Sequence, residues 1–207
     1  MSPETIVAFL GAALVLAFVP GPDNLFVLTN SAIHGRKVGF TIVLGLCTGL
    51  LVHTAAVALG VATIIQTSQL AFSILKYAGA VYLCYLAWQA FRTKADSIDA
   101  SPESIKRGKS FYLRGIVMNA TNPKVSIFFL TFLPQFVDPQ AGKVTLQLLA
   151  LGGLFIFATI VAFGIIATFS ASLGARLTNS STAQNIMNKA AGVIYIGLAV
   201  RLAASER

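Results

Sequence analysis

Charged residues are scarce in this chain, and acidic residues are the scarcest of them. Of its 207 residues 11% are charged, with 7 acidic side chains against 15 Lys and Arg, while 56% are hydrophobic. Soluble domains contain about 25% charged residues. Residues 5–22, 38–75 and 144–175 contain no Asp, Glu, Lys or Arg, and crossing a bilayer takes about 20 apolar residues. The composition excludes an ordinary soluble domain and predicts several membrane-spanning helices.

Further absences exclude classes of function. The 2 cysteines, Cys47 and Cys84, lie in separate apolar segments without zinc-ligand spacing, so we expect buried structural thiols and no metal site. A membrane enzyme would need a nucleophile with its base or a metal cluster, and the chain has no HExxH motif, GxSxG motif or acidic cluster. The net charge of +8 does not indicate nucleic acid, because the basic residues cluster between apolar segments. We therefore expect neither an enzyme nor a cofactor.

Turns and charges divide the chain into six spans without the alternation of barrel strands. These spans cover about residues 5–33, 39–65, 70–91, 114–134, 144–171 and 186–204. The one long polar stretch lies between Arg92 and Lys109, and we expect it to be a solvated connector. The sequence thus predicts an all-α membrane protein with a three-helix repeat at residues 1–91, a cytoplasmic linker at 92–113 and a second three-helix repeat at 114–207.

The basic residues lie mainly in alternate loops, and this predicts the orientation in the membrane. Loops rich in Lys and Arg stay in the cytoplasm. Three loops hold ten of these residues, namely Arg36, Lys37, Arg92, Lys94, Lys106, Arg107, Lys109, Arg114, Arg176 and Lys189. The opposite side has four, Lys76, Lys143, Arg201 and Arg207. Both termini should therefore face away from the cytoplasm.

Three short matches occur in the same order in the two halves. They pair Pro22-Asp23 with Pro123-Lys124, VALG at 57–60 with VAFG at 161–164, and KYAGAVY at 76–82 with KAAGVIY at 189–195. Each half has an odd number of spans, so a duplicated half must lie upside down relative to its twin. We therefore predict two inverted repeats.

Proline-rich breaks interrupt the first and fourth spans at corresponding places. The breaks are PGPDN at 20–24 and NATNPK at 119–124. Proline removes a backbone donor and ends or kinks a helix, so Pro20, Gly21, Pro22 and Pro123 are the expected breaks and hinges. Broken helices at matching places in inverted repeats mark the substrate site of secondary transporters.

Asp23 and Lys124 are the charges placed deep within spans. At 1.5 Å per residue they lie roughly 20 and 15 Å from Arg36 and Arg114, near the middle of a hydrocarbon core about 30 Å thick. Charges at this depth must pair with each other or with a ligand. An ion pair that only locks two helices is the structural alternative.

A zwitterionic amino acid would suit these two charges. Its carboxylate would bind Lys124 and freed backbone N–H groups, and its ammonium would bind Asp23 and freed carbonyls. Asn24, Asn119 and Asn122 add uncharged donors and acceptors, with helix capping as the equally supported alternative. Asp23 could take up a proton when the substrate leaves, because burial disfavours the charged form.

Other polar and small residues in the spans have less specific interpretations. His53 could relay protons, but a hydrogen bond to a neighbouring helix is the favoured interpretation. Gly45, Gly49, Gly152 and Gly153 indicate close helix packing. A homodimer along a Gly-rich face is a further expectation.

Four stretches together resemble the LysE/RhtB family of amino-acid exporters. They are PGPDNLFVLTNSAIHGRKVGF at 20–40, LKYAGAVYLCYLAWQAFR at 75–92, NATNPKVSIFFLTFLPQFV at 119–137 and KAAGVIYIGLAVRL at 189–202. The resemblance implies six helices in two inverted halves and export driven by the proton motive force across the bacterial inner membrane. It assigns Asp23 and Asn24 to one family motif, and Asn122, Pro123 and Lys124 to the other.

The resemblance leaves the substrate open. Members of this family handle lysine and arginine, threonine and homoserine, leucine, or cysteine-related compounds. Because Asp23 is the one acidic residue within a span, a neutral amino acid is favoured over a dibasic one. A heavy-metal or other cation exporter is the alternative, although it would need several carboxylates or thiolates at one depth. A channel or a scaffold is not distinguished from a carrier by the sequence.

Overall fold

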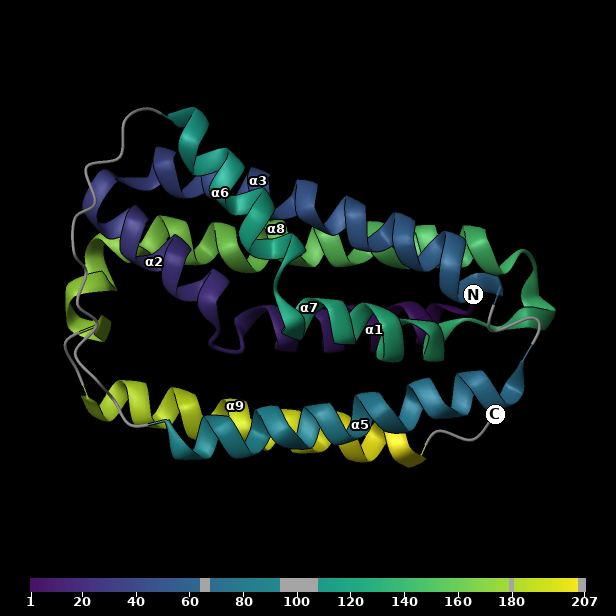
Figure 1. The fold of residues 1–207 in the computed structure, drawn as a ribbon. Helices are drawn as coiled ribbons and strands as arrows, with labels where there is room; N and C mark the ends of the chain where they lie inside the picture. Colours follow the sequence, from purple (N-terminus) through teal and green to yellow (C-terminus); the bar gives the residue numbers. More distant parts are fainter. Residues whose placement is uncertain (64–67, 94–107, 179–180, 205–207) are drawn as a thin grey trace.

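The computed structural model describes residues 1–63, 68–93, 108–178 and 181–204, which form helices and short connections (Figure 1). Within these ranges the chain contains no strand. The prediction of an all-α protein is therefore confirmed for the described part. The middle of the predicted linker, residues 94–107, lies outside the described residues.

The first apolar run forms two helices that meet at an angle. Helix α1 (Pro3–Phe18) begins at Ser2, whose Oγ accepts a hydrogen bond from the Thr5 amide, and α2 spans Pro22–His34. Their axes differ by 61°. Pro20 and Pro22 lack the N–H groups that the carbonyls four residues earlier would bond, so the α-helical ladder stops there. Helix α2 ends at Gly35, whose φ of +85° favours glycine.

The next two spans are helices without such a break. Helix α3 (Arg36–Ala56) continues into one turn of π-helix, η1 (Val57–Val61), and α5 covers Gln69–Arg92. Ser68 caps α5, because its Oγ accepts from the Ala71 amide at 3.1 Å. These elements are two of the four described helices that are long and apolar enough to cross a membrane alone.

The second half also begins with a bent pair of helices. Helix α6 (Gly108–Ala120) is followed by α7 (Pro123–Ile127), which continues through η2 (Phe128–Phe132) and η3 (Leu133–Phe136). The two parts are bent by 48°. After η4 (Pro139–Ala141) come the long helices α8 (Val144–Thr178) and α9 (Ser181–Ala204). Counting each bent pair as one span, the described helices provide up to six membrane spans.

Helix α6 begins earlier than the second half was expected to begin. Its first residue is Gly108, whereas Arg114 was the predicted boundary. A charged residue marks where an apolar segment leaves the hydrocarbon core, but the helix itself can continue into the headgroup region, where charged residues are tolerated.

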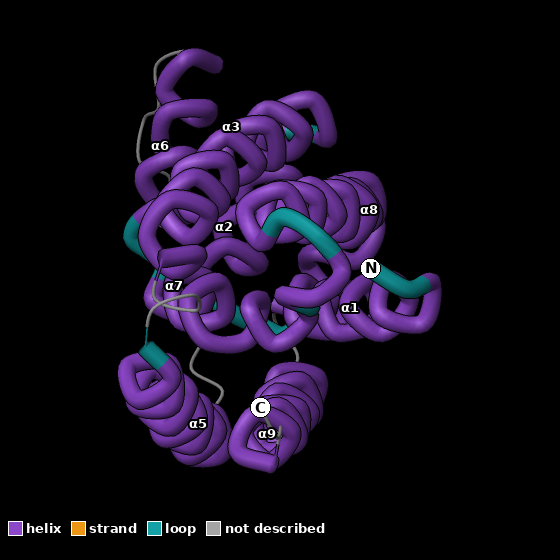
Figure 2. The backbone as a smooth tube through the Cα atoms, turned by 90° about the vertical axis from the view of Figure 1, so that its right-hand side faces the viewer, coloured by secondary structure: helices purple, strands orange, loops and turns teal. Residues whose placement is uncertain are grey.

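The helices form a bundle with one separate pair along its side (Figures 1 and 2). Helices α2, α3, α6 and α8 pack together, α1 lies against α8, and α5 pairs with α9. The start of α1 and the end of α9 lie at the same end of the bundle, opposite the α2–α3 connection (Figure 1). The α5–α9 pair contacts the rest of the protein mainly through η2.

Glycines allow the closest helix contacts. A Cβ atom on Gly115 would lie 2.6 Å from the Ile42 carbonyl oxygen, so the backbones of α3 and α6 touch directly. Gly45 faces the same contact, and Gly152 leaves room for the side chain of Thr54. The expectation of close packing is wrong for Gly153, whose Cβ would have no neighbour within 4 Å. Adjacent helix positions point about 100° apart, so only one glycine of the 152–153 pair can face α3.

A cluster of phenylalanines joins α1, η2 and α8 on one side of the two breaks. The Phe155 ring lies 5.2 Å from that of Phe128 and 5.1 Å from that of Phe129. Phe9 of α1 adds a fully buried ring at 6.3 Å from Phe128. These contacts fix α7 and η2 against α1 and α8, and thereby fix where the two breaks meet.

The cysteine expectation is only half right. Cys47 of α3 is buried, but Cys84 of α5 is exposed. Helix α5 buries one stripe of residues, among them Gly79, Leu83 and Ala87, and Cys84 lies outside that stripe. An apolar segment in a membrane does not need to be covered on all sides by protein.

Candidate functional site

The two bends bring the first turns of α2 and α7 together inside the bundle. Each helix begins with proline followed by a charged residue, Pro22-Asp23 in α2 and Pro123-Lys124 in α7. Both charged side chains are buried, with exposed fractions of 2% for Asp23 and 6% for Lys124. Charged groups so deeply buried must have nearby polar partners.

Lys124 finds its partners on the C-terminal end of α1. Its Nζ donates to the Val19 carbonyl at 3.0 Å and to the Leu16 carbonyl at 3.5 Å. The Leu16 carbonyl has no helical partner because residue 20 is a proline. A cation at this end of α1 is also favoured by the helix dipole. The first break is therefore closed by a side chain from the second half of the protein.

Asp23 is bound by an amide instead of by the lysine. Its Oδ2 accepts a hydrogen bond from Asn119 Nδ2 at 3.3 Å. Asp23 and Lys124 attract each other electrostatically. An ion pair requires an N···O distance of 4.0 Å or less, and within the described residues these two side chains form none. The structure thus holds the two charges near each other without direct contact, unlike the helix-locking ion pair considered as the alternative.

The three asparagines bond to the backbone around the breaks. Asn24 Nδ2 donates to the Ala17 carbonyl at 2.7 Å, which ties α2 to the end of α1. Asn122 Oδ1 accepts from the Lys124 amide at 3.0 Å and caps α7. The amide of Asn119 holds Asp23. Capping, one of the two interpretations of these residues, is confirmed for Asn122.

Several polar atoms at this site are buried without a hydrogen-bond partner. They are the acceptors Asp23 Oδ1, Asn24 Oδ1 and Asn119 Oδ1 and the donor Asn122 Nδ2. An unpaired buried polar group costs about 1–3 kcal/mol. One oxygen of the Asp23 carboxylate and the side-chain oxygens of Asn24 and Asn119 can accept hydrogen bonds from a cation. The amide of Asn122 and the ammonium of Lys124 can donate to an anion.

His53 joins the site from α3, and sequence reasoning had left it outside. Its Nε2 donates to the Asn119 carbonyl at 3.1 Å, which confirms the predicted bond to a neighbouring helix. In a continuous helix this carbonyl would bond the amide of residue 123, which is a proline; here it accepts from the Asn122 amide at 3.0 Å as well as from His53. His53 also interacts electrostatically with Asp23, and its ring lies 5.6 Å from that of Phe129. Its place in the middle of an apolar span was the available indication.

Two glycines keep space for the site residues. A Cβ atom on Gly49 would lie 2.8 Å from Asn119 Cβ and Oδ1, and one on Gly21 would lie 3.1 Å from Lys124 Nζ. The backbone of Gly21 is extended, with φ of −168°, so space rather than conformation is the constraint there. The sequence marked both glycines, but not that they face these two side chains.

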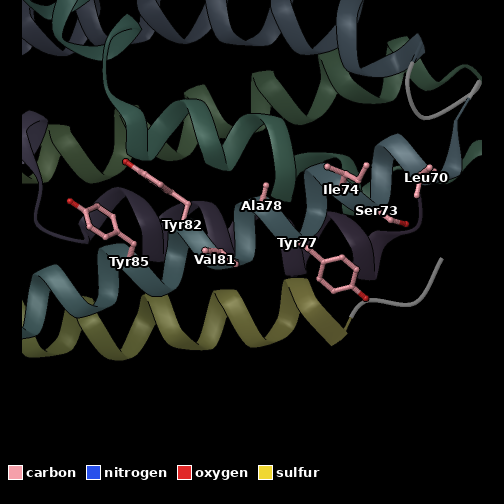
Figure 3. A pocket seen from close by; sticks show the side chains of 8 residues that line it. All are labelled: Leu70, Ser73, Ile74, Tyr77, Ala78, Val81, Tyr82 and Tyr85. Carbon is pink, nitrogen blue, oxygen red and sulfur yellow. The ribbon is translucent and has the colours of Figure 1, made fainter.

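We also searched the described residues for a metal site and for a groove with charged groups. Among the described residues, no group of three or more His, Cys, Asp and Glu side chains could hold a metal ion. A groove of about 920 Å³ runs along α5 between Leu70 and Tyr85 (Figure 3). Its polar lining consists of Ser73 and tyrosines, without a charged side chain. The polar groups that match a charged small molecule therefore lie at the breaks.

Comparison with known proteins identifies relatives of this chain. Over 211 residues the chain is 34% identical to the homoserine/homoserine lactone efflux protein of Salmonella typhimurium, covering 100% of this chain and 99% of the relative. It is 32% identical to the leucine efflux protein of the same species, covering 94% and 92%. The membrane protein YrhP of Bacillus subtilis is 26% identical, over 96% and 98%. No solved structure matches the chain. The family model for the LysE type translocator matches residues 14–206, so this chain belongs to that family.

Proposed function

We propose that this protein exports neutral amino acids across the bacterial inner membrane in exchange for protons. The observation that carries the proposal is the pair of opposite charges, Asp23 and Lys124, held apart at two helix breaks beside unpaired donor and acceptor atoms. Family membership supports transport, and relatives named for the efflux of homoserine and of leucine support amino acids as substrates.

The substrate would bind between the two charges. Its ammonium would donate to Asp23 Oδ1 and to the free side-chain oxygens of Asn24 and Asn119. Its carboxylate would accept from Lys124 and from Asn122 Nδ2. Lys124 has three N–H donors and uses two of them on the carbonyls at the end of α1. Its third donor can bind a carboxylate while the other two stay on these carbonyls.

Proton coupling follows from the burial of Asp23. A carboxylate at this depth is costly without a compensating positive charge. The substrate ammonium supplies that charge in the loaded state, and a proton supplies it after the substrate leaves. Asp23 would thus carry either the substrate or a proton, but not both, which is the requirement for antiport.

A neutral substrate is supported by the charges that the site lacks. The side chain of lysine or arginine would bring a second cation into the membrane, where it would need a second acidic partner. Asp23 is the one acidic residue of the spans. The substrates in the names of the two relatives, homoserine and leucine, have no cationic side chain.

We further propose that residues 1–91 and 114–207 are inverted repeats joined by a linker at 92–113. The packing supports this symmetry: the broken pair α1–α2 lies against α8, α6 lies against α3, and the last helices of the two halves, α5 and α9, pair with each other. Pro20, Gly21, Pro22 and Pro123 would then be the hinges at which the half-helices move.

The orientation and the oligomeric state complete the proposal. The two termini share one end of the bundle (Figure 1), which supports placing both outside the cytoplasm, and Arg36 and Lys37 lie at the opposite end. Gly45 and Gly49 are used in contacts within the chain, so a homodimer would need another face. The exposed apolar side of α5 offers one (Figure 3).

The test is efflux from proteoliposomes loaded with a labelled mixture of neutral and basic amino acids, with and without a pH gradient. We expect neutral amino acids to leave in a gradient-dependent way from vesicles with the wild-type protein, and Asp23→Asn to abolish this coupling. Asp138→Asn is the matched control, because Asp138 is exposed and caps η4. If folded wild-type protein moves no amino acid, the proposal fails, and the same vesicles then test divalent metal ions.

A further inference from the structure

We propose that His53 is the group that exchanges protons between the outer side of the membrane and Asp23. This inference rests on the proton-coupled export proposed above. It assigns to His53 a role in coupling, not in binding the amino acid.

The first argument is the connection between His53 and Asp23. Asn119 touches both residues, since its carbonyl accepts from His53 Nε2 at 3.1 Å and its side-chain amide donates to Asp23 Oδ2 at 3.3 Å. The imidazole also interacts electrostatically with Asp23. A histidine is able to gain and lose a proton near neutral pH. A single residue, Asn119, connects His53 to the carboxylate of Asp23, which has to be protonated.

The second argument is access. Asp23 is 2% exposed, whereas His53 is half-buried. His53 lies 17 residues beyond Arg36 on α3, or roughly 25 Å at 1.5 Å per residue. The helix continues as η1 to Val61, 8 residues or roughly 12 Å further, so His53 lies past the middle of the span toward the end of η1. That end of the bundle carries both termini (Figure 1). By these counts His53 lies about 5 Å nearer to that end than Asp23 does, and in the proposed orientation protons enter from that end.

The third argument is the charge that surrounds His53. The Asn119 carbonyl accepts the hydrogen bond of His53 Nε2, and the side chain of the same asparagine holds the carboxylate of Asp23. From η2 comes the uncharged ring of Phe129. Helix α8, which packs along α3, has no acidic or basic residue between Val144 and Ser170. The ammonium of Lys124 is directed to the carbonyls of α1. The acidic neighbour of His53 is thus Asp23, reached through Asn119, and none of these described contacts to the imidazole is made by a cation.

The step is balanced as a single proton transfer. A proton from the outer water binds the neutral imidazole and gives an imidazolium. When the substrate ammonium leaves, the imidazolium releases this proton to the carboxylate of Asp23, which gives a neutral acid and a neutral imidazole. The Nε2 proton points at the Asn119 carbonyl, so the transfer uses Nδ1 or a ring that has moved from that carbonyl.

The test compares His53→Gln with wild type in two assays. Gln keeps an N–H donor for the Asn119 carbonyl but cannot carry a proton. Exchange of labelled for unlabelled neutral amino acid across vesicles at equal pH needs no net proton movement. We expect exchange to stay within about twofold of wild type and gradient-driven efflux to fall by about tenfold or more, as for the loss of a proton-transfer group. His34→Gln, at the exposed end of α2, is the matched control and should leave both rates unchanged.

Every other outcome overturns the inference. If His53→Gln retains gradient-driven efflux, His53 has only its structural bond to α6. If it loses both activities while remaining folded, His53 belongs to the substrate site. Where Gln prevents folding, His53→Asn replaces it in the same comparison. Wild-type vesicles without gradient-driven efflux would refute the proposed function instead, so the two failures are distinct.

Discussion

Asp23 and Lys124 hold the same position in two half-helices but have opposite surroundings. A lysine in the first turn of α7 faces the unfavourable end of its own helix dipole. Its ammonium reaches the carbonyls at the end of α1, where the dipole has the opposite sign. Asp23 in the first turn of α2 is favoured by its own helix. At the residue scale, each charge is thus stabilised by a helix end.

Lys124→Met tests the role of the lysine. The substitution keeps a side chain of similar length but removes its charge. If the lost interaction with the substrate carboxylate is worth roughly 1.4 kcal/mol or more, we expect efflux of neutral amino acids to fall by about tenfold or more. The Leu16 and Val19 carbonyls lose their donor, and we expect a loss of stability of about 1–3 kcal/mol. Proteoliposome efflux and thermal unfolding in detergent measure the two effects. Lys143→Met, in an exposed connection, is the control, and unchanged efflux of the Lys124 variant would contradict the assignment.

Gly49→Ala tests whether the space beside Asn119 matters. The new methyl group would lie 2.8 Å from Asn119 Cβ and Oδ1, and overpacking of this kind costs about 1–3 kcal/mol. We expect Asn119 to shift away from Asp23 and exchange activity to decrease. Gly153→Ala, where the methyl group meets nothing within 4 Å, should behave as wild type. Equal activity of the two variants would show that Asn119 need not hold its position.

At the scale of elements, carbonyls next to the breaks accept hydrogen bonds from side chains of other helices. The carbonyls of Leu16 and Asn119 both precede a proline by four residues; Lys124 donates to the first, and His53 donates to the second beside the Asn122 amide. In the transport cycle that we propose, the half-helices tilt and the distance between two such partners changes. The breaks would then supply both the ligands and the hinges.

Pro123→Ala tests the second break. Alanine restores an N–H at residue 123, which can bond the Asn119 carbonyl in place of His53 and straighten the junction of α6 and α7. We expect the protein to remain folded by circular dichroism but to exchange amino acids more slowly, by about tenfold if the bend contributes roughly 1.4 kcal/mol to the barrier. Pro139→Ala, in the exposed turn η4, is the comparison, and wild-type exchange by the Pro123 variant would argue against a hinge.

At the scale of the whole molecule, the start of α1 and the end of α9 lie at one end of the bundle, and the α2–α3 connection with Arg36 and Lys37 lies at the other (Figure 1). This separation is consistent with the proposed orientation, in which Arg36 and Lys37 face the cytoplasm. The α5–α9 pair lies to one side and keeps an exposed apolar face. The orientation and the oligomeric state are therefore tested on the intact protein in a membrane.

Cysteine labelling tests the orientation. In a protein without its own Cys47 and Cys84, we expect Ser2→Cys to react with a membrane-impermeant thiol reagent added outside intact cells, and Lys37→Cys to react only after the membrane is opened. The reverse pattern would invert the proposed topology. Both residues are exposed on the protein surface. A cysteine that does not react in intact cells would therefore be shielded by the membrane and not by the protein.

The mass of the protein in nanodiscs tests the proposed homodimer. We expect twice the chain mass of 21.8 kDa after correction for lipid. Tyr77→Arg on the exposed face of α5 places a charge where apolar contact is expected and should reduce the mass to that of one chain. A single-chain mass for the wild type would refute the dimer.

The amino-acid sequence by itself determined the class of the molecule, the broad span pattern and the location of the breaks. Long runs without charge leave a helix in a membrane as the solution that satisfies the backbone. Proline acts locally, so the ends of α1 and α6 follow from Pro20, Pro22 and Pro123 without knowledge of the fold. The depth of Asp23 and Lys124 follows from counting residues along a helix. These features depend on neighbours in the sequence.

The tertiary structure decided which groups meet. Asn119 and Asp23 are 96 residues apart, and Lys124 and Leu16 are 108 apart. Whether they touch depends on the rotation and tilt of packed helices, which no local pattern specifies. The same holds for His53, whose bond to α6 needs the backbone contact at Gly45 and Gly115, and for Gly152, which faces α3 while Gly153 does not. Sequence spacing set each residue on its helix, and packing set its partner.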